Sequence, residues 1–90
     1  MANEYHDFSL SVREVNYLKH LAHRDDTIAR LLRFQTDDRG RATIRLSCDA
    51  VEQVRDRLGT LLMMYGFNKD DSPNEDGLMI EALIDKFFVR

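Results

Sequence analysis

Apolar residues recur three or four positions apart in four stretches of the chain, which is the spacing of a helix that buries one face. Residues that commonly cap helices stand near the start of these stretches, including Ser11 in the capping-box pattern Ser11-Val12-Arg13-Glu14. The pattern predicts helices over residues 12–23, 26–34, 48–65 and 74–88. The predicted core-facing stripe of the third helix comprises Val51, Val54, Leu58, Leu61, Leu62 and Tyr65, and that of the fourth comprises Met79, Ile80, Leu83, Ile84 and Phe87.

Residues 42–46 alternate in polarity and include β-branched side chains, a pattern typical of a strand. They can pair with residues 5–10, pair with the end of the second helix, or form only an extended lead-in to the third helix. Gly66 is expected to stop the third helix at its C′ position. We therefore expect an all-α fold: a compact bundle of about four helices in one domain over residues 1–90, with a short strand or hairpin near 42–46 left open.

Length and composition fit one small globular domain of 90 residues, of which 43% are hydrophobic and 32% are charged. The sequence has no run of about 18 apolar residues, so no membrane-spanning segment is expected. Residues 1–5 lack the basic start and apolar run of a secretion signal. The single cysteine, Cys48, cannot form an internal disulfide. Together these features predict a cytoplasmic protein.

Charge is unevenly distributed along the chain, whose formal net charge is −3. The segment from Arg24 to Arg45 holds six arginines and four aspartates, whereas the segment from Leu46 to Arg90 holds five basic and nine acidic residues. A chain with a basic middle and an acidic end can attract partners of either sign or pair with itself.

Patterns that carry known catalytic chemistry are absent from the sequence, which has no GxSxG, P-loop, GxGxxG or HExxH motif. Cys48 has no base beside it in the sequence, so its expected role is that of a small apolar filler. Glu81 and Asp85 share one helix face, where surface carboxylates are the expected interpretation. We expect no enzymatic activity, no cofactor and no small-molecule substrate.

Two patterns resemble metal sites without meeting their requirements. The stretch from Asp70 to Glu81 spaces its oxygen-bearing residues like a calcium loop, but glutamate occupies the sixth position, where an EF-hand needs glycine. His20 and His23 lie three positions apart on a solvated helix face, and a third ligand would have to come from His6 or Cys48. The expected structures are a loop followed by a helix cap and a solvated face, so no metal is expected.

Four apolar residues fall outside the core-facing stripes of the last two helices. By helical spacing Met63 lies on the side of Glu52, while Met64 lies on the other side of the third helix. Leu78 and Phe88 likewise flank the acidic face of the fourth helix. Either neighbouring segments bury these residues, or they form an exposed surface for a partner or a second copy.

The C-terminal half carries segments that resemble a known group of proteins: Ile44-Arg-Leu-Ser47, Val54-Arg-Asp-Arg-Leu58, Gly66-Phe-Asn68 and Pro73-Asn-Glu-Asp-Gly-Leu-Met-Ile-Glu-Ala-Leu-Ile-Asp85. They are similar to small uncharacterised bacterial proteins in which a leucine–serine cap precedes a Gly-Phe-Asp loop and a helix of the pattern Pro-x-Glu-x-Gly-x-x-Leu-Glu-x-Leu-Ile-Asp. Asn68 replaces the usual aspartate of that loop. The resemblance implies a bacterial origin and brings no activity with it.

These observations favour a non-enzymatic, protein-binding accessory or regulatory domain. The residues expected to contact a partner or a second copy are Met63, Met64, Leu78 and Phe88 through apolar surface and Arg30, Arg33, Arg39 and Arg41 through charge. One alternative is a nucleic-acid-binding regulator that uses the Arg24–Arg45 segment. A further alternative is a small inhibitor or immunity-type protein, a role that suits compact acidic helical domains.

Overall fold

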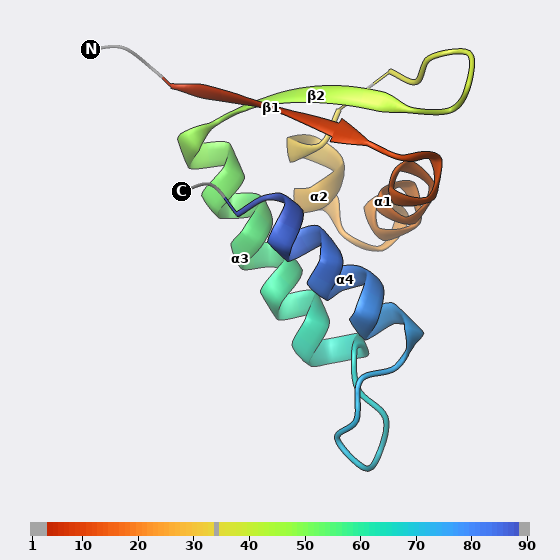
Figure 1. Ribbon diagram of the computed structural model, residues 1–90. Helices are drawn as coiled ribbons and strands as arrows, with labels where there is room; N and C mark the ends of the chain where they lie inside the picture. Colours follow the sequence, from red (N-terminus) through yellow and green to blue (C-terminus); the bar gives the residue numbers. More distant parts are fainter. Residues whose placement is uncertain (1–3, 34, 89–90) are drawn as a thin grey trace.

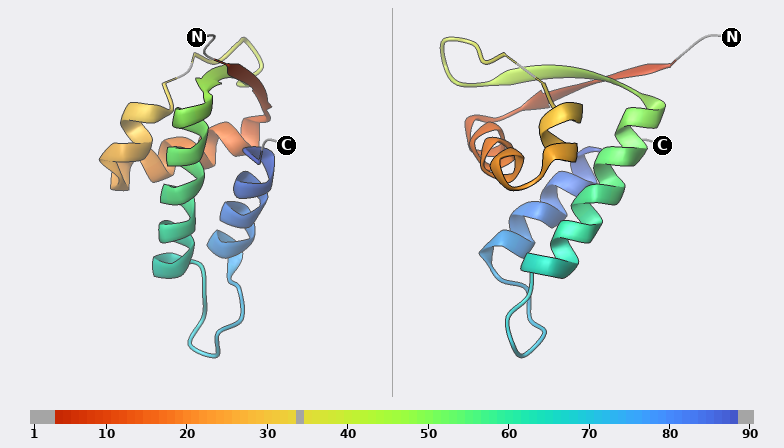
Figure 2. Two further views of the ribbon diagram at one scale, coloured as in Figure 1. Left: turned by 90° about the vertical axis from the view of Figure 1, so that its left-hand side faces the viewer. Right: turned by 180° about the vertical axis from the view of Figure 1, so that it is seen from behind.

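A computed structural model describes residues 4–33 and 35–88. Within these residues the elements follow the order β1 (Tyr5–Leu10), α1 (Val12–Arg24), α2 (Asp26–Leu31), β2 (Ala42–Ser47), α3 (Cys48–Tyr65) and α4 (Glu75–Lys86). The two strands form a ribbon along one side, and all four helices lie beneath it (Figure 1). Helices α3 and α4 run side by side, with their connecting loop at the end farthest from the sheet (Figures 1 and 2).

The expectation of an all-α bundle is corrected by the sheet, because the fold is mostly helical but includes a strand pair. Strand β2 pairs with β1 in antiparallel register, so that Phe8 faces Ile44 and Leu10 faces Ala42. The strand explains why residues 42–46 alternate in polarity: every second side chain turns toward the helices and is buried. Of the alternatives for this segment, pairing with residues 5–10 is the one observed.

Four helices were expected and four occur among the described residues, with some ends displaced. Helix α2 stops at Leu31, short of the predicted residue 34, because Leu32 leaves helical geometry with φ −108° and ψ 73° and turns its side chain into the core. Residue 34 itself lies outside the described residues. Helix α4 begins after Asn74, which is its N-cap, and ends at Lys86, inside the predicted range of 74–88.

Gly66 ends α3 for a reason other than the one expected. Its φ is −87°, so it does not adopt the left-handed conformation of a C′ glycine. The missing side chain is needed instead for a close approach, because a Cβ on Gly77 would stand 2.1 Å from the Gly66 carbonyl oxygen. This contact lets the backbones of α3 and α4 touch beside their connecting loop.

One core fills the space between the ribbon and the helices. Its buried residues are Phe8, Leu10, Val15, Leu18, Leu21, Ile28, Leu32, Ala42, Ile44, Leu46, Val51, Val54, Leu58, Leu61, Ile80, Leu83 and Phe87. The predicted stripes of the third and fourth helices include most of the core residues that α3 and α4 contribute. Tyr65 was predicted to face the core and does not. It is exposed at the end of α3, where the Arg24 guanidinium lies 5.8 Å from the centre of its ring. A planar cation over an aromatic ring explains why this position tolerates exposure.

A buried ion pair joins α2 to the middle of α3. The Asp25 side chain caps α2 by accepting a hydrogen bond from the Ile28 amide at 3.1 Å, and it also accepts one from the Arg57 guanidinium. Burial opposes ionisation of Asp25, but the Ile28 amide and the Arg57 guanidinium outweigh it and hold the pKa of the carboxyl below its usual range. Asp25 therefore remains charged inside the protein at neutral pH.

Candidate functional site

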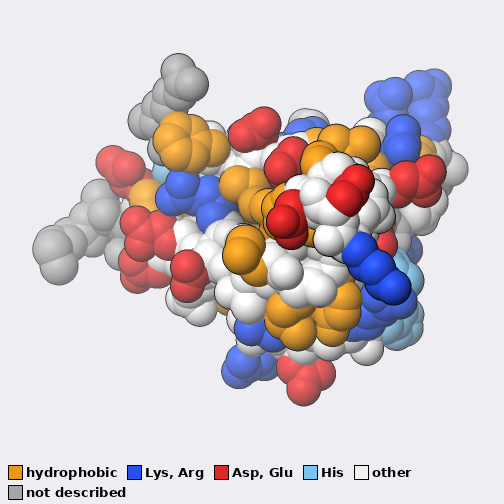
Figure 3. Space-filling model, turned by 90° about the horizontal axis from the view of Figure 1, so that it is seen from below, with side chains coloured by type: hydrophobic (Ala, Val, Ile, Leu, Met, Phe, Trp, Pro, Cys, Tyr) orange, Lys and Arg blue, Asp and Glu red, His pale blue; other side chains and the backbone are white. Residues whose placement is uncertain are grey.

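Several exposed large apolar side chains lie where α3 and α4 meet their connecting loop. Met63 is 76% exposed and Leu78 is 58% exposed, and Met64 and Phe67 are also exposed. Neighbouring segments therefore do not bury these residues, which was one of the two alternatives left open by the sequence. Figure 3 looks at this end of the molecule and shows hydrophobic side chains in several groups with acidic side chains between them.

Local hydrogen bonds hold this end of the molecule in place. The Asn74 side-chain oxygen accepts a hydrogen bond from the Gly77 amide at 2.7 Å and so caps α4. Its side-chain nitrogen donates to the Tyr65 carbonyl at 2.8 Å, which ties the end of α3 to the start of α4. Phe67 and Pro73 face each other across the base of the loop in an antiparallel bridge. The exposed apolar residues thus lie on a braced scaffold.

The structure brings three of the four predicted apolar contact residues to this end. Met63 precedes Gly66 by one helical turn and Leu78 follows Gly77, so the glycine contact places both near the meeting point of the helices. Met64 lies on the same last turn of α3, about 100° further around the helix. Phe88 is ten residues beyond Leu78 in the chain, at the other end of α4. We name Met63, Met64, Phe67 and Leu78 the hairpin-end surface.

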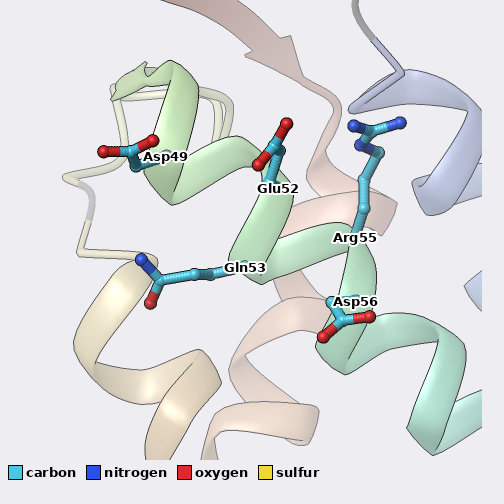
Figure 4. Close-up of a pocket in the computed structure, with 5 residues that line it drawn as sticks. All are labelled: Asp49, Glu52, Gln53, Arg55 and Asp56. Atoms are coloured by element: carbon cyan, nitrogen blue, oxygen red, sulfur yellow. The ribbon is translucent and has the colours of Figure 1, made fainter.

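An acidic depression lies on α3 toward its other end. It is lined by Asp49, Glu52, Gln53, Arg55 and Asp56, whose side chains leave successive turns of the helix (Figure 4). The Arg55 guanidinium lies 5.1 Å from the Phe88 ring, so Phe88 packs on this cation instead of joining the hairpin-end surface. Glu52 and Asp56 share the side of α3 that carries Met63 one or more turns later. The apolar surface therefore continues into an acidic one.

The predicted arginines lie in a different part of the molecule. Arg30, Arg33, Arg39 and Arg41 are all exposed, on α2 and on the connection to β2, at the opposite end from the α3–α4 loop (Figure 1). The Asp37 carboxylate shapes this connection by accepting hydrogen bonds from the amides of Arg39 and Arg41, at 2.8 and 2.9 Å. The two predicted sets of contact residues therefore belong to two separate surfaces.

Part of the Arg24–Arg45 segment does converge. Arg33 and Arg45 line one shallow hollow beside β2, together with Gln35 and Thr43. Arg45 also pairs with Asp7 across the strands at 2.9 Å, and this contact holds the pKa of Asp7 below its usual range. Arg24 is engaged by the Tyr65 ring. Arginines near the sheet thus offer a modest cationic surface.

A second cluster was missed by sequence reasoning. Cys48 is exposed, which corrects its expected role as apolar filler. Its Sγ lies 3.4 Å from the Nε2 atom of His6 and 3.9 Å from a carboxylate oxygen of Glu4. The cysteine therefore has a histidine neighbour in space that it lacks in sequence. The signal that could have revealed it is strand pairing, because opposing residues 5–10 to residues 42–46 brings the start of β1 beside the start of α3.

Of the two patterns that resembled metal sites, the stretch from Asp70 to Glu81 has a local role in the described structure. The Asp70 carboxylate accepts hydrogen bonds from the Ser72 amide and hydroxyl at 3.1 and 2.6 Å, and these bonds lower the pKa of Asp70. Asn74 caps α4, as described above, so this stretch forms a loop followed by a helix cap. His20 and His23 are both exposed on α1.

No protein-family model, no curated protein and no solved structure matches this chain. Among the described residues, none of the helices has the length and apolar character needed to cross a membrane.

Proposed function

We propose that this chain is a non-enzymatic protein-binding domain that acts as an accessory or regulatory subunit in a bacterial cytoplasm. The observation that carries the proposal is the hairpin-end surface, where Met63, Met64 and Leu78 are exposed on a braced pair of helices. Exposed apolar groups cost free energy in water, and covering them is the main favourable term in protein association. Methionine adapts its shape to a partner because its side chain is long and unbranched.

The charge around this surface supports a proposal for the kind of partner. Glu52, Asp56, Glu81 and Asp85 are exposed on the same two helices, so the apolar surface is accompanied by negative charge. A partner that presents apolar residues together with lysine or arginine satisfies both features. We therefore propose that the occupant is a basic amphipathic segment of another protein, laid along α3 and α4 from the hairpin end.

The proposal is tested by comparing the wild-type chain with Met63→Ser/Met64→Ser in capture from nuclease-treated lysate, followed by binding measurements on the purified partner. Both methionines are exposed, so the double variant is expected to keep its helical circular dichroism. Loss of two apolar contacts should weaken binding of the purified partner by roughly tenfold or more. The matched control is Val12→Ser, which removes an exposed apolar side chain at the other end of the molecule and should bind like the wild type.

Equal affinity of the wild type and Met63→Ser/Met64→Ser for the purified partner would contradict the proposal. Retention of no protein by the wild-type chain would contradict it as well. A partner without a basic amphipathic segment would overturn the assignment of the occupant.

The alternative function, binding of nucleic acid, has one observation in its favour. Arg33 and Arg45 line the same hollow beside β2, and Arg41 is exposed on the connection that leads into this strand. Affinity for single-stranded or duplex oligonucleotides should then fall steeply as salt rises, and it should fall further in Arg33→Ala/Arg41→Ala. Absence of binding to either kind of oligonucleotide at low salt would eliminate this alternative.

A further inference from the structure

The cluster of Glu4, His6 and Cys48 combines three different kinds of metal ligand. Cys48 offers a sulfur atom, His6 a ring nitrogen and Glu4 a carboxylate oxygen, and these ligand atoms all lie within 4.8 Å of one another. His6 is half-buried, whereas Glu4 and Cys48 are exposed and open to solvent. Among residues 4–33 and 35–88, these three residues form the group of histidine, cysteine and acidic side chains whose ligand atoms are close enough to share one ion.

The sheet explains why these residues meet. Glu4 and His6 belong to the same alternating row of side chains as Phe8 and Leu10, which face the core. Where the core ends, the row changes from apolar to metal-ligating residues. The Cys48 amide donates a hydrogen bond to the Glu4 carbonyl at 3.2 Å, so pairing continues past the strands and places the first residue of α3 against this row.

The spacing of the ligand atoms fits a single ion. Zinc binds sulfur at about 2.3 Å and nitrogen or oxygen at about 2.0–2.2 Å, so tetrahedral ligands stand roughly 3.3–3.8 Å apart. The sulfur-to-nitrogen distance of 3.4 Å and the sulfur-to-oxygen distance of 3.9 Å are close to this range. The charges also agree, because a thiolate and a carboxylate together neutralise a divalent cation.

We propose that Glu4, His6 and Cys48 bind one Zn²⁺ ion and leave its fourth position to water. Cys48 releases its thiol proton to solvent as the sulfur–zinc bond forms, and His6 binds through the lone pair of Nε2. The ion joins the start of β1 to the start of α3, two points that are distant in the sequence. This site is separate from the hairpin-end surface, and it stands or falls independently of the proposed function.

The test uses Co²⁺, which enters zinc sites and absorbs light when a thiolate binds it. The metal-free chain is titrated with CoCl₂ while the sulfur-to-cobalt charge-transfer absorption is recorded, followed by a titration with ZnCl₂. Because Cys48 is the single cysteine of the chain, this absorption reports on Cys48 directly. We expect saturation at one equivalent of Co²⁺ and loss of the absorption when Zn²⁺ displaces it.

Variants assign the ligands. Cys48→Ser should abolish the charge-transfer absorption, and His6→Ala should weaken Co²⁺ binding by about 100-fold or more, since even indirect partners of a metal ligand are worth 10–100-fold. The matched control is His20→Ala/His23→Ala, which removes two exposed histidines three residues apart and should bind Co²⁺ like the wild type. Circular dichroism of each variant verifies that the fold is retained, and His6→Gln replaces His6→Ala if the alanine variant is unfolded.

Two results would overturn the proposal. One is the absence of sulfur-to-cobalt absorption in the wild type at millimolar CoCl₂. The other is binding that survives in the folded His6 variant but is lost in His20→Ala/His23→Ala, which would place the metal on α1.

Discussion

The two ends of helix α3 are built in different ways. At its N-terminal end Cys48 contacts Glu4, which is 44 positions away in the chain, and the neighbouring strand supplies His6. At its C-terminal end Tyr65 is held by Asn74, which is only nine positions away. One end is therefore assembled by the tertiary fold, whereas the other is assembled by a local helical hairpin.

The difference shows where each kind of chemistry can arise. Distant segments bring unlike side chains together, so the N-terminal end of α3 gathers sulfur, nitrogen and oxygen ligands. The local hairpin instead displays side chains of neighbouring turns, so Met63 and Leu78 are both exposed near its connecting loop. A substitution at one end should consequently leave the chemistry of the other end intact.

The sharpest way to break the C-terminal end alone is Gly77→Ala. The new Cβ would stand 2.1 Å from the Gly66 carbonyl oxygen, and the helices must separate to admit it. We expect the free energy of unfolding to fall by about 3 kcal/mol, at the upper part of the range for overpacked sites. Urea unfolding measures this loss, and Co²⁺ titration should show unchanged affinity at Cys48 because the fold near the sheet is retained.

The control for this substitution is Gly59→Ala, which changes a glycine of α3, the neighbouring helix of the hairpin. Apart from the adjoining backbone of its own helix, no atom lies within 4 Å of the Cβ that it adds, so the variant should gain about 0.5–1 kcal/mol from its better helix propensity. A Gly77→Ala variant as stable as Gly59→Ala would show that the backbone contact does not hold the hairpin.

The middle of α3 can be probed through the Asp25–Arg57 pair. Replacement of Asp25 by asparagine keeps a capping side chain but removes its charge, and we expect a loss of about 2 kcal/mol at pH 7. This figure lies below the usual cost of breaking a buried pair because the Arg57 side chain is 38% exposed and water screens its charge. Both ends of α3 should lose stability together, since this pair supports the helix at its centre.

The pH dependence of the same variant has a defined sign. The folded-state pKa of Asp25 lies below its ordinary value of 3.8, so its ionisation stabilises the fold above pH 3.8. That contribution is lost as the pH falls from 3.8 through the lower folded-state pKa. The stability difference between the wild type and Asp25→Asn, measured by urea unfolding, should therefore shrink below pH 3.8. A difference that stays constant there would contradict the lowered pKa.

The smallest expected effects come from the two helix caps, which separate the ends most cleanly. Ser47→Ala and Asn74→Ala each remove one N-cap and should each cost about 1 kcal/mol in urea unfolding. Ser47→Ala should weaken Co²⁺ binding at the adjacent Cys48 and leave the hairpin-end surface unaffected. Asn74→Ala should do the reverse and weaken partner binding. If both variants changed Co²⁺ binding and partner binding equally, the two ends of α3 would not be independent, and the comparison would be wrong.

The features that depend on near neighbours in the chain could be predicted from the sequence. The Ser11–Glu14 capping box and most of the α3 stripe follow from helical spacing, and the structure confirms the box with reciprocal hydrogen bonds. Helical spacing placed Met63 outside the stripe but left its burial open, and the structure shows it exposed. Pairing of β1 with β2 could only be named as one alternative, because it joins segments 32 or more residues apart. The Cys48 cluster depends on that pairing and was missed for this reason.

The long separation between β1 and β2 has a consequence for the order of folding. Closing a loop between Leu10 and Ala42 costs more conformational entropy than joining α3 to α4 through its short connection. We therefore expect the helical hairpin to form early and the ribbon to close late. Until the ribbon closes, the backbone amide and carbonyl groups of β2, with the sequence Ala-Thr-Ile-Arg-Leu-Ser, have no partner strand. Unpaired strands of this kind favour aggregation between newly made chains.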